Sequence, residues 1–275
     1  MRIGQIVPSS NTTMETEIPA IFRARETLFP EDGAFTFHSS RMRMKKVVKA
    51  ELEAMDRDSY RCAAELADAA VDVVGYACLV AIMSMREGYH CQSQAGLRQR
   101  MKEEGSEAPV ITSAGALVDE LKLAGARAVA MVTPYLQPLT DLVAGYIEHE
   151  GIQVIDAIAL GIPNNLEVGR RDPLALLDDI ERLNTRGADA VVLSACVQMP
   201  SLAAIPRAQD RLGVPVTSAA ICTARSMMRA LKLEPLAPDA GYFLSPANLT
   251  PGTLAPEAGG FNERKDRARR ALRTA

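Results

Sequence analysis

Two cysteines occupy matching places in the sequence. Cys78 follows the run VVGYA and Cys196 follows VVLSA, so each thiol comes after an alanine at the end of a β-branched stretch. Thiolate is the reactive form of cysteine, and its pKa falls at the amino end of a helix. Both cysteines precede sequences that favour a helix start, whose free N–H groups also hold carboxylates or oxyanions. The pair therefore predicts a nucleophile beside an anion site.

The other three cysteines are predicted to be structural. Cys62 lies in a helical run and Cys222 in apolar sequence, where a free cysteine packs as a small hydrophobe. Cys91 has polar neighbours, and we expect it on a helix surface. An odd number of cysteines without a CxxC pair indicates free thiols rather than a disulfide framework or a zinc knuckle. The histidines lack metal-ligand spacing, so we expect no metal site.

Composition excludes several classes of protein. The 275 residues are 48% hydrophobic and 24% charged, which is typical of a soluble globular protein. A net charge of -3, with basic residues dispersed among acidic ones, offers no attraction for nucleic acid. No apolar run is long enough to span a bilayer, and the first residues, MRIGQIVPSS, lack the apolar core of a signal peptide. We therefore expect a cytoplasmic protein without nucleic-acid or membrane partners.

The elements that must position the two thiols follow from the hydrophobic pattern. Apolar β-branched runs alternate with longer amphipathic stretches, which indicates parallel sheets covered by helices. The pattern predicts helices over 47–70 and over 173–187, the second with apolar residues at steps of three and Gly187 as a stop. It predicts strands at 3–7, 34–38, 71–75, 110–112, 128–132, 154–158, 190–193 and 214–217.

The eight strands fall into two matching sets of four. Three pairs of segments resemble one another in the same order: RIGQIVPSSN and RAVAMVTPYL, VDVVGYACLV and ADAVVLSACV, APVITSAGALVDEL and VPVTSAAICTARSM. We therefore predict an α/β fold of two similar flavodoxin-like domains, each with a four-stranded parallel sheet, related by pseudo-twofold symmetry with the active site between them. The predicted domains are 1–120 and 121–222, with 223–275 packing back onto the first and ending in a surface tail.

Ligands of a parallel α/β sheet bind outside the carboxyl ends of its strands. Two such domains facing one another would place Cys78 and Cys196 on opposite walls of one cleft. Other polar residues also follow strands: Asn11 after the first, Tyr135 after the fifth, and the pair Asn164 and Asn165 after the sixth. Helix capping is an alternative explanation for Asn11, as turn formation is for the asparagine pair. A phenol at Tyr135 is a common donor to an anion.

The segments PSSNTTMETE, YACLVAIM, VTPY, IPNN and SACVQMPS carry a family likeness over about residues 1 to 248. The chain resembles maleate cis-trans isomerases of the aspartate/glutamate racemase superfamily, which also includes arylmalonate decarboxylases. The racemases typically carry Cys-Asn-Thr in one half and Gly-Cys-Thr in the other, and neither occurs here. The decarboxylases keep only the cysteine of the second half, whereas this chain has both.

The resemblance implies a cofactor-independent isomerisation of maleate, a small dicarboxylate, to fumarate. It implies Cys78 as the nucleophile and Cys196 as its partner in proton handling or charge balance. It also implies a homodimer or a higher homo-oligomer. The implied substrate-binding positions are Asn11, Leu79, Val80, Tyr135, Asn165 and Val197.

That reaction is chemically reasonable for a thiol, because addition to C2 makes the double bond temporarily single and gives a succinyl-cysteine. Two alternatives stay open. A racemase or decarboxylase of the same superfamily would use the thiols for proton transfer on an amino acid, a hydantoin or a malonate derivative. A non-catalytic carboxylate-binding or redox-sensing protein would use the same cleft without turnover.

Overall fold

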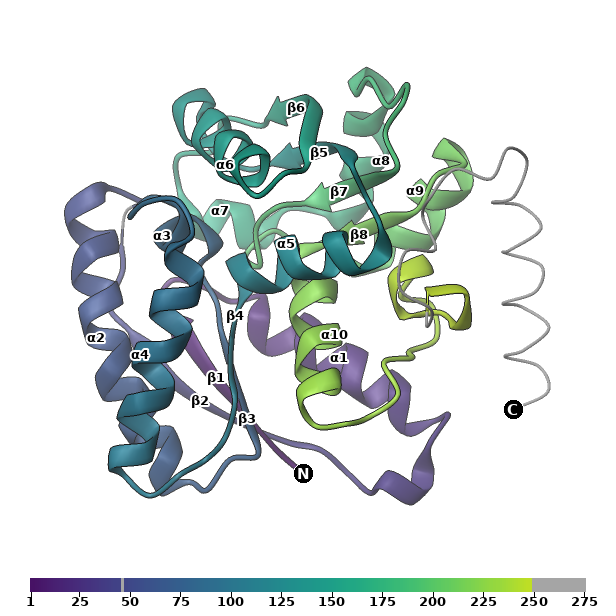
Figure 1. Ribbon diagram of the computed structural model, residues 1–275. Coiled ribbons are helices and arrows are strands. Elements are labelled where there is room, and N and C mark those ends of the chain that lie inside the picture. Colours follow the sequence, from purple (N-terminus) through teal and green to yellow (C-terminus); the bar gives the residue numbers. More distant parts are fainter. Residues whose placement is uncertain (46, 249–275) are drawn as a thin grey trace.

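The computed structural model describes residues 1–45 and 47–248, and its eight strands form two four-stranded parallel sheets (Figure 1). The first sheet has the order β2-β1-β3-β4 and the second β6-β5-β7-β8. The identical order confirms the duplication and the predicted fold class. The strands are β1 (Arg2–Pro8), β2 (Thr36–Met42), β3 (Val73–Tyr76), β4 (Val110–Thr112), β5 (Ala128–Thr133), β6 (Gln153–Ala159), β7 (Ala190–Ser194) and β8 (Val216–Ser218).

Helices follow most strands, as expected for this topology. The α-helices of the described residues are α1 (Met14–Glu26), α2 (Lys49–Asp68), α3 (Leu79–Met83), α4 (Tyr89–Glu103), α5 (Ser113–Ala124), α6 (Gln137–His149), α7 (Asn165–Arg170), α8 (Leu176–Asp179), α9 (Ile205–Leu212) and α10 (Ala219–Ala230). Short 3₁₀ helices lie at η1 (Pro30–Asp32), η2 (Pro173–Ala175), η3 (Ile180–Arg182), η4 (Leu202–Ala204), η5 (Tyr242–Leu244) and η6 (Pro246–Asn248).

Two predicted elements differ from the structure. The strand expected at 34–38 begins at Thr36 and continues to Met42, pairing along the whole of β1 from Arg2 to Pro8. Its second half is polar, so the apolar pattern did not reveal it. The continuous helix expected over 173–187 is wrong, because η2, α8 and η3 divide that segment into three short turns. Apolar residues at steps of three match the 3.0-residue period of a 3₁₀ helix better than that of an α-helix.

The helices cover both faces of the first sheet. Helices α2 and α4 pack together on one face, and α1 and α10 lie on the other (Figure 1). The side of α2 that faces the sheet buries Leu52, Met55 and Cys62, at the spacing of an amphipathic helix. Cys62 and Cys222 are buried and Cys91 is exposed, which confirms their predicted surroundings.

Helix α10 follows the last strand of the second sheet and packs against α1 and α5. A buried ion pair between Arg225 of α10 and Glu120 of α5 joins these two helices. Helix α10 thus packs on helices of the first half of the chain, and the predicted return of 223–275 to the first domain stays a prediction. The boundaries near residues 120 and 222 stay predictions, and the tail expected over 249–275 lies outside the described residues.

Candidate active site

The two sheets meet at the carboxyl ends of their strands, where a small inner cavity lies between them. The cavity has a volume of about 20 Å³ and is lined from both halves. Its walls contain Pro8, Asn11, Met44, Val47, Cys78 and Val80 from the first half, and Tyr135, Asn165, Cys196, Val197 and Gln198 from the second. The structure thus brings both cysteines to one cavity, together with five of the six predicted substrate-binding residues.

The sixth residue, Leu79, does not line the cavity. It is the first residue of α3, and its side chain is 1% exposed within the core. Val80 and Val197 do line it and are themselves almost fully buried. The side chains of Val80 and Val197 form apolar parts of the cavity wall, whereas that of Leu79 packs in the core. The substrate-binding roles of these three residues stay predictions.

Cys78 lies two residues beyond β3, at the position that caps the short helix α3. Its backbone has φ 94° and ψ 71°, in the left-handed region that a non-glycine residue rarely adopts. Such strain persists only where the surrounding structure imposes it, and it concentrates at functional sites. Here it turns the chain directly from the strand into α3 at the residue that carries the thiol.

Cys196 lies two residues beyond β7, but no helix begins there. The chain makes a turn instead, and the next regular element is η4. The predicted helix start after Cys196 is therefore wrong. The turn supplies equivalent donors, because the backbone N–H groups of Gln198 and Met199 hydrogen-bond the thiol.

Burial decides the acidity of both thiols in the absence of substrate. Burial, with a smaller contribution from charge on Cys196, raises the pKa of Cys78 to about 12, and the N–H of Ala81 opposes this rise. Burial also raises the pKa of Cys196, which the Tyr135 hydroxyl and the two N–H groups oppose. The sequence suggested that a helix end would lower these values, but desolvation is the larger effect.

Tyr135 follows β5, and its hydroxyl lies beside the thiol of Cys196. Its hydroxyl hydrogen-bonds Cys196 and lies 3.5 Å from the carbonyl oxygen of Ala195. Burial raises the pKa of Tyr135 well above 10, so the phenol keeps its proton and acts as a donor. The hydroxyl of Tyr135 thus donates to the sulfur of Cys196, and its expected donation to a bound anion stays a prediction.

Asn11 combines the two explanations that its sequence left open. Its Oδ1 accepts hydrogen bonds of 3.0 Å from the N–H groups of Thr13 and Met14 at the start of α1. The hydrogen bonds of its side chain within the described residues are made by Oδ1, not by the amide nitrogen, and Asn11 lines the cavity. These two hydrogen bonds fix the rotamer of Asn11 just ahead of the N-cap residue Thr13, which leaves the NH₂ group available for an anion.

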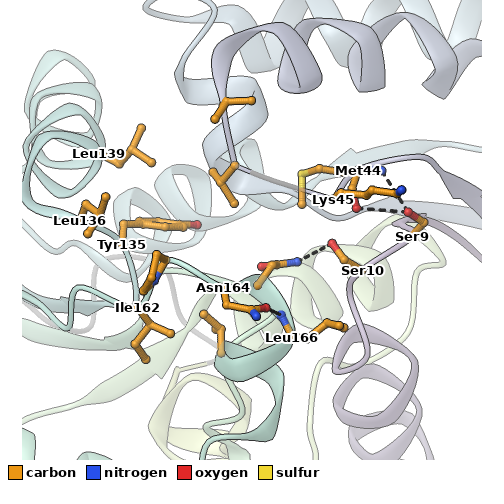
Figure 2. A pocket seen from close by; sticks show the side chains of 15 residues that line it. Ser9, Ser10, Met44, Lys45, Tyr135, Leu136, Leu139, Ile162, Asn164 and Leu166 are labelled. Atoms are coloured by element: carbon orange, nitrogen blue, oxygen red, sulfur yellow. Dashed lines mark hydrogen bonds between the residues drawn. The ribbon is translucent and has the colours of Figure 1, made fainter.

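The two adjacent asparagines divide their tasks. Asn164 caps α7, because its Oδ1 accepts from the N–H of Leu166 at 2.9 Å (Figure 2). Asn165 lines the inner cavity, and its Nδ2 donates to the hydroxyl of Ser10 at 2.8 Å. The structure therefore places Asn165, rather than Asn164, beside the two cysteines.

A larger outer cavity of about 720 Å³ adjoins the inner one, with Met44, Val47, Tyr135 and Asn165 lining both. Figure 2 shows its apolar side chains, among them Leu136, Leu139 and Ile162, with Ser9 and Ser10 on the opposite wall. No charged residue lines the inner cavity within the part of the chain that the structure describes. Any anion there must be held by neutral donors.

Sequence reasoning missed several cavity residues. Gln198 stood within the quoted segment SACVQMPS but was not singled out, and Pro8, Met44 and Val47 gave no chemical signal. In residues 1–45 and 47–248 no cluster of His, Cys, Asp and Glu is arranged to hold a metal ion. Among the helices of those residues, none has the length and apolarity needed to cross a membrane.

The comparison with protein families agrees with the geometry. The arylmalonate decarboxylase family model matches residues 3–244, and the chain belongs to this family. A maleate isomerase from Alcaligenes faecalis is 60% identical over 244 residues, which cover 89% of this chain and 96% of that protein. The chain therefore groups with the maleate isomerases of the family, and the resemblance carried by the five sequence segments is confirmed.

Solved structures extend this likeness to the fold. A cysteine-to-alanine variant of the maleate isomerase from Pseudomonas putida S16, crystallised with maleate, has a TM-score of 0.87 and 55% identity, covering 89% of this chain and 97% of that one. A cysteine-to-serine mutant of the maleate cis-trans isomerase from Nocardia farcinica has a TM-score of 0.83 and 43% identity, covering 88% and 97%. That mutant holds a covalently bound succinylcysteine intermediate.

Proposed function

We propose that this protein isomerises maleate to fumarate without a cofactor, through a succinyl-cysteine on Cys78. The observation that carries the proposal is the placement of two cysteines from matching positions of two domains in one small, uncharged cavity. The succinylcysteine of the Nocardia farcinica relative supports the same covalent chemistry.

The first step makes the double bond single. Cys78 first loses its proton to solvent, against its raised pKa. The thiolate then adds to C2 of maleate, the π electrons move to C3, and the adjacent carboxylate shares the resulting negative charge. Cys196 then gives its proton to C3 and becomes a thiolate. Tyr135 and the N–H groups of Gln198 and Met199 stabilise that thiolate through the hydrogen bonds that oppose its raised pKa.

The remaining steps reverse the addition in a new geometry. Rotation about C2–C3 of the succinyl group brings the two carboxylates to opposite sides. The Cys196 thiolate removes a proton from C3, the double bond re-forms, and Cys78 leaves as a thiolate. Atoms and charge balance over the cycle, so no oxidant, reductant or metal is needed.

A dianion approaching a thiolate needs compensation, and the cavity offers neutral donors for it. Among residues 1–45 and 47–248, the amide nitrogen of Asn11 has no hydrogen-bond partner. Asn165 lines the same cavity from the second half of the chain. We assign the two substrate carboxylates to these two asparagines. The inner cavity of about 20 Å³ must widen to admit maleate, and the flexible side chain of Met44 lines both cavities.

We also propose that the protein is a cytoplasmic homodimer. All five cysteines are free, which suits a reducing compartment, and the family resemblance supports a dimer. Light scattering after gel filtration tests the oligomeric state, and a monomer at micromolar concentration would contradict this part of the proposal.

The activity is tested by incubating the purified protein with maleate and following the olefinic proton signals by NMR. We expect the maleate signal to decline while the fumarate signal grows. A folded protein that leaves maleate unchanged contradicts the proposal. If maleate is inert while solvent deuterium enters the α-carbon of an amino acid or a malonate derivative, the protein is a racemase or decarboxylase instead.

A further inference from the structure

The side chain of Gln198 joins three segments of the cavity wall. Its Oε1 accepts from the N–H of Thr12 at 2.8 Å, and its Nε2 donates to the carbonyl oxygens of Ser10 at 3.1 Å and Asn165 at 2.7 Å. The backbone carbonyl of Gln198 also accepts from the hydroxyl of Thr13 at 2.7 Å. One residue of the second domain is thus bonded to the β1–α1 loop of the first.

These bonds surround the proposed carboxylate-binding groups. Ser10 and Thr12 are the two chain neighbours of Asn11, so the Gln198 amide holds the backbone on both sides of that residue. The same amide holds the backbone of Asn165 directly. Gln198 is 2% exposed and both of its Nε2 hydrogens are used, so its side chain has one defined orientation.

A glycine in α7 marks how tightly this junction is packed. A Cβ built on Gly169 would lie 2.5 Å from Nε2 of Gln198 and 2.6 Å from the hydroxyl oxygen of Thr12. Side chains do not tolerate such distances, so any larger residue would push α7 away from the junction. Only a glycine allows α7, which begins with Asn165, to approach the first domain this closely.

We propose that Gln198 is a positioning residue that sets the separation of Asn11 and Asn165 across the cavity, and so selects a ligand with two carboxylates at the spacing of a four-carbon diacid. This inference rests on the proposed function, because it assigns one carboxylate to each asparagine. Gln198 affects substrate binding by holding the two segments that carry Asn11 and Asn165. Its own side chain takes no part in the reaction.

The proposal predicts a separation of kinetic effects. In Gln198→Met the side chain keeps its length and stays uncharged, but it loses the acceptor for Thr12 and the donor that faces two carbonyl oxygens. We expect KM for maleate to rise at least about tenfold while kcat changes by less than about threefold, because the asparagines bind substrate and transition state alike. A loss of folded protein would lower kcat instead and leave KM unchanged.

Gly169→Ala disturbs the same junction from the other side and should reproduce the rise in KM. Gly145→Ala is its matched control, since Gly145 also lies inside a helix, α6, and a Cβ there meets no atom within 4 Å. We expect Gly145→Ala to keep the KM and kcat of the unmodified protein.

Binding of two unreactive acids provides the decisive readout. Succinate spans both asparagines and propanoate contacts one, so Gln198→Met and Gly169→Ala should weaken succinate binding about tenfold and leave propanoate binding within twofold. Equal weakening of both acids, or no weakening of either, overturns the positioning role. Because the unmodified protein is assayed with maleate in parallel, failure of the proposed function shows itself separately as absence of fumarate.

Discussion

Cys78 and Cys196 occupy matching positions, each two residues beyond the third strand of its sheet, yet their surroundings differ. Cys78 lies on a strained left-handed residue before a short helix, and the N–H of Ala81 is the donor that lowers its pKa. Cys196 lies in an irregular turn, where the Tyr135 hydroxyl and two N–H groups lower its pKa. The duplicated fold has kept the positions of the sulfurs and changed their donors.

This difference assigns roles that the sequence left interchangeable. A thiolate with few donors is less stabilised and more nucleophilic, because nucleophilicity rises with thiol pKa. A sulfur that accepts several hydrogen bonds carries a negative charge more easily. This suits a group that gives up a proton and takes it back. We therefore assign attack to Cys78 and proton transfer to Cys196, in agreement with the division that the family resemblance implied.

The largest effect should come from removing the nucleophile. Cys78→Ser keeps the shape of the cavity but replaces the thiol by a hydroxyl that is far harder to ionise. We expect the rate of fumarate formation to fall at least roughly 10⁴-fold, with no covalent adduct by mass spectrometry. Cys91→Ser is the matched control. Cys91 is exposed on α4, so its substitution should leave the rate unchanged.

Removing one donor from Cys196 should have a smaller effect. Tyr135→Phe deletes the hydroxyl that hydrogen-bonds this thiol and leaves the ring in place. The pKa of Cys196 should rise, and we expect kcat to fall about 10- to 100-fold, since one preorganised donor to a developing anion is lost. Unchanged kcat, measured at saturating maleate, would mean that Cys196 carries no charge in the rate-limiting step.

The pH dependence of alkylation reports the raised pKa of Cys78 directly. With a pKa of about 12 the free thiol is protonated at neutral pH, so its thiolate fraction should grow about tenfold per pH unit up to pH 10. Iodoacetamide labelling of Cys78 in the Cys91→Ser background, quantified by peptide mass spectrometry, measures this slope. A plateau near pH 7 would show that the site stabilises the thiolate even without substrate.

The smallest effects distinguish the adjacent asparagines. Asn165→Ala should raise KM for maleate about tenfold, because it removes a proposed carboxylate donor. Asn164→Ala removes the cap of α7 and should cost about 1 kcal/mol of stability while leaving KM unchanged. Thermal unfolding and steady-state kinetics on both variants make the comparison, and exchanged effects would reassign the carboxylate-binding residue.

The fold could be read from the sequence because its signal is local and repeated. The VVGYACLV and VVLSACVQ segments predict a strand before each cysteine. Each thiol therefore lies at the carboxyl end of its own sheet, and the two ends face one cavity. The turn after Cys196 and the polar second half of β2 escaped prediction, because no apolar period marks them. The Gln198 junction escaped because its partners, Ser10, Thr12 and Asn165, lie far away in the sequence.

Trapping the covalent intermediate tests the division of roles most directly. Cys196→Ser should slow proton transfer while leaving Cys78 able to attack, so the adduct should accumulate when the variant is mixed with maleate and quenched in acid. We expect peptide mapping to show a mass increase of one maleate on Cys78. An adduct on Cys196 in the reciprocal variant Cys78→Ser, with none on Cys78 in Cys196→Ser, would contradict the assignment of Cys78 as the nucleophile.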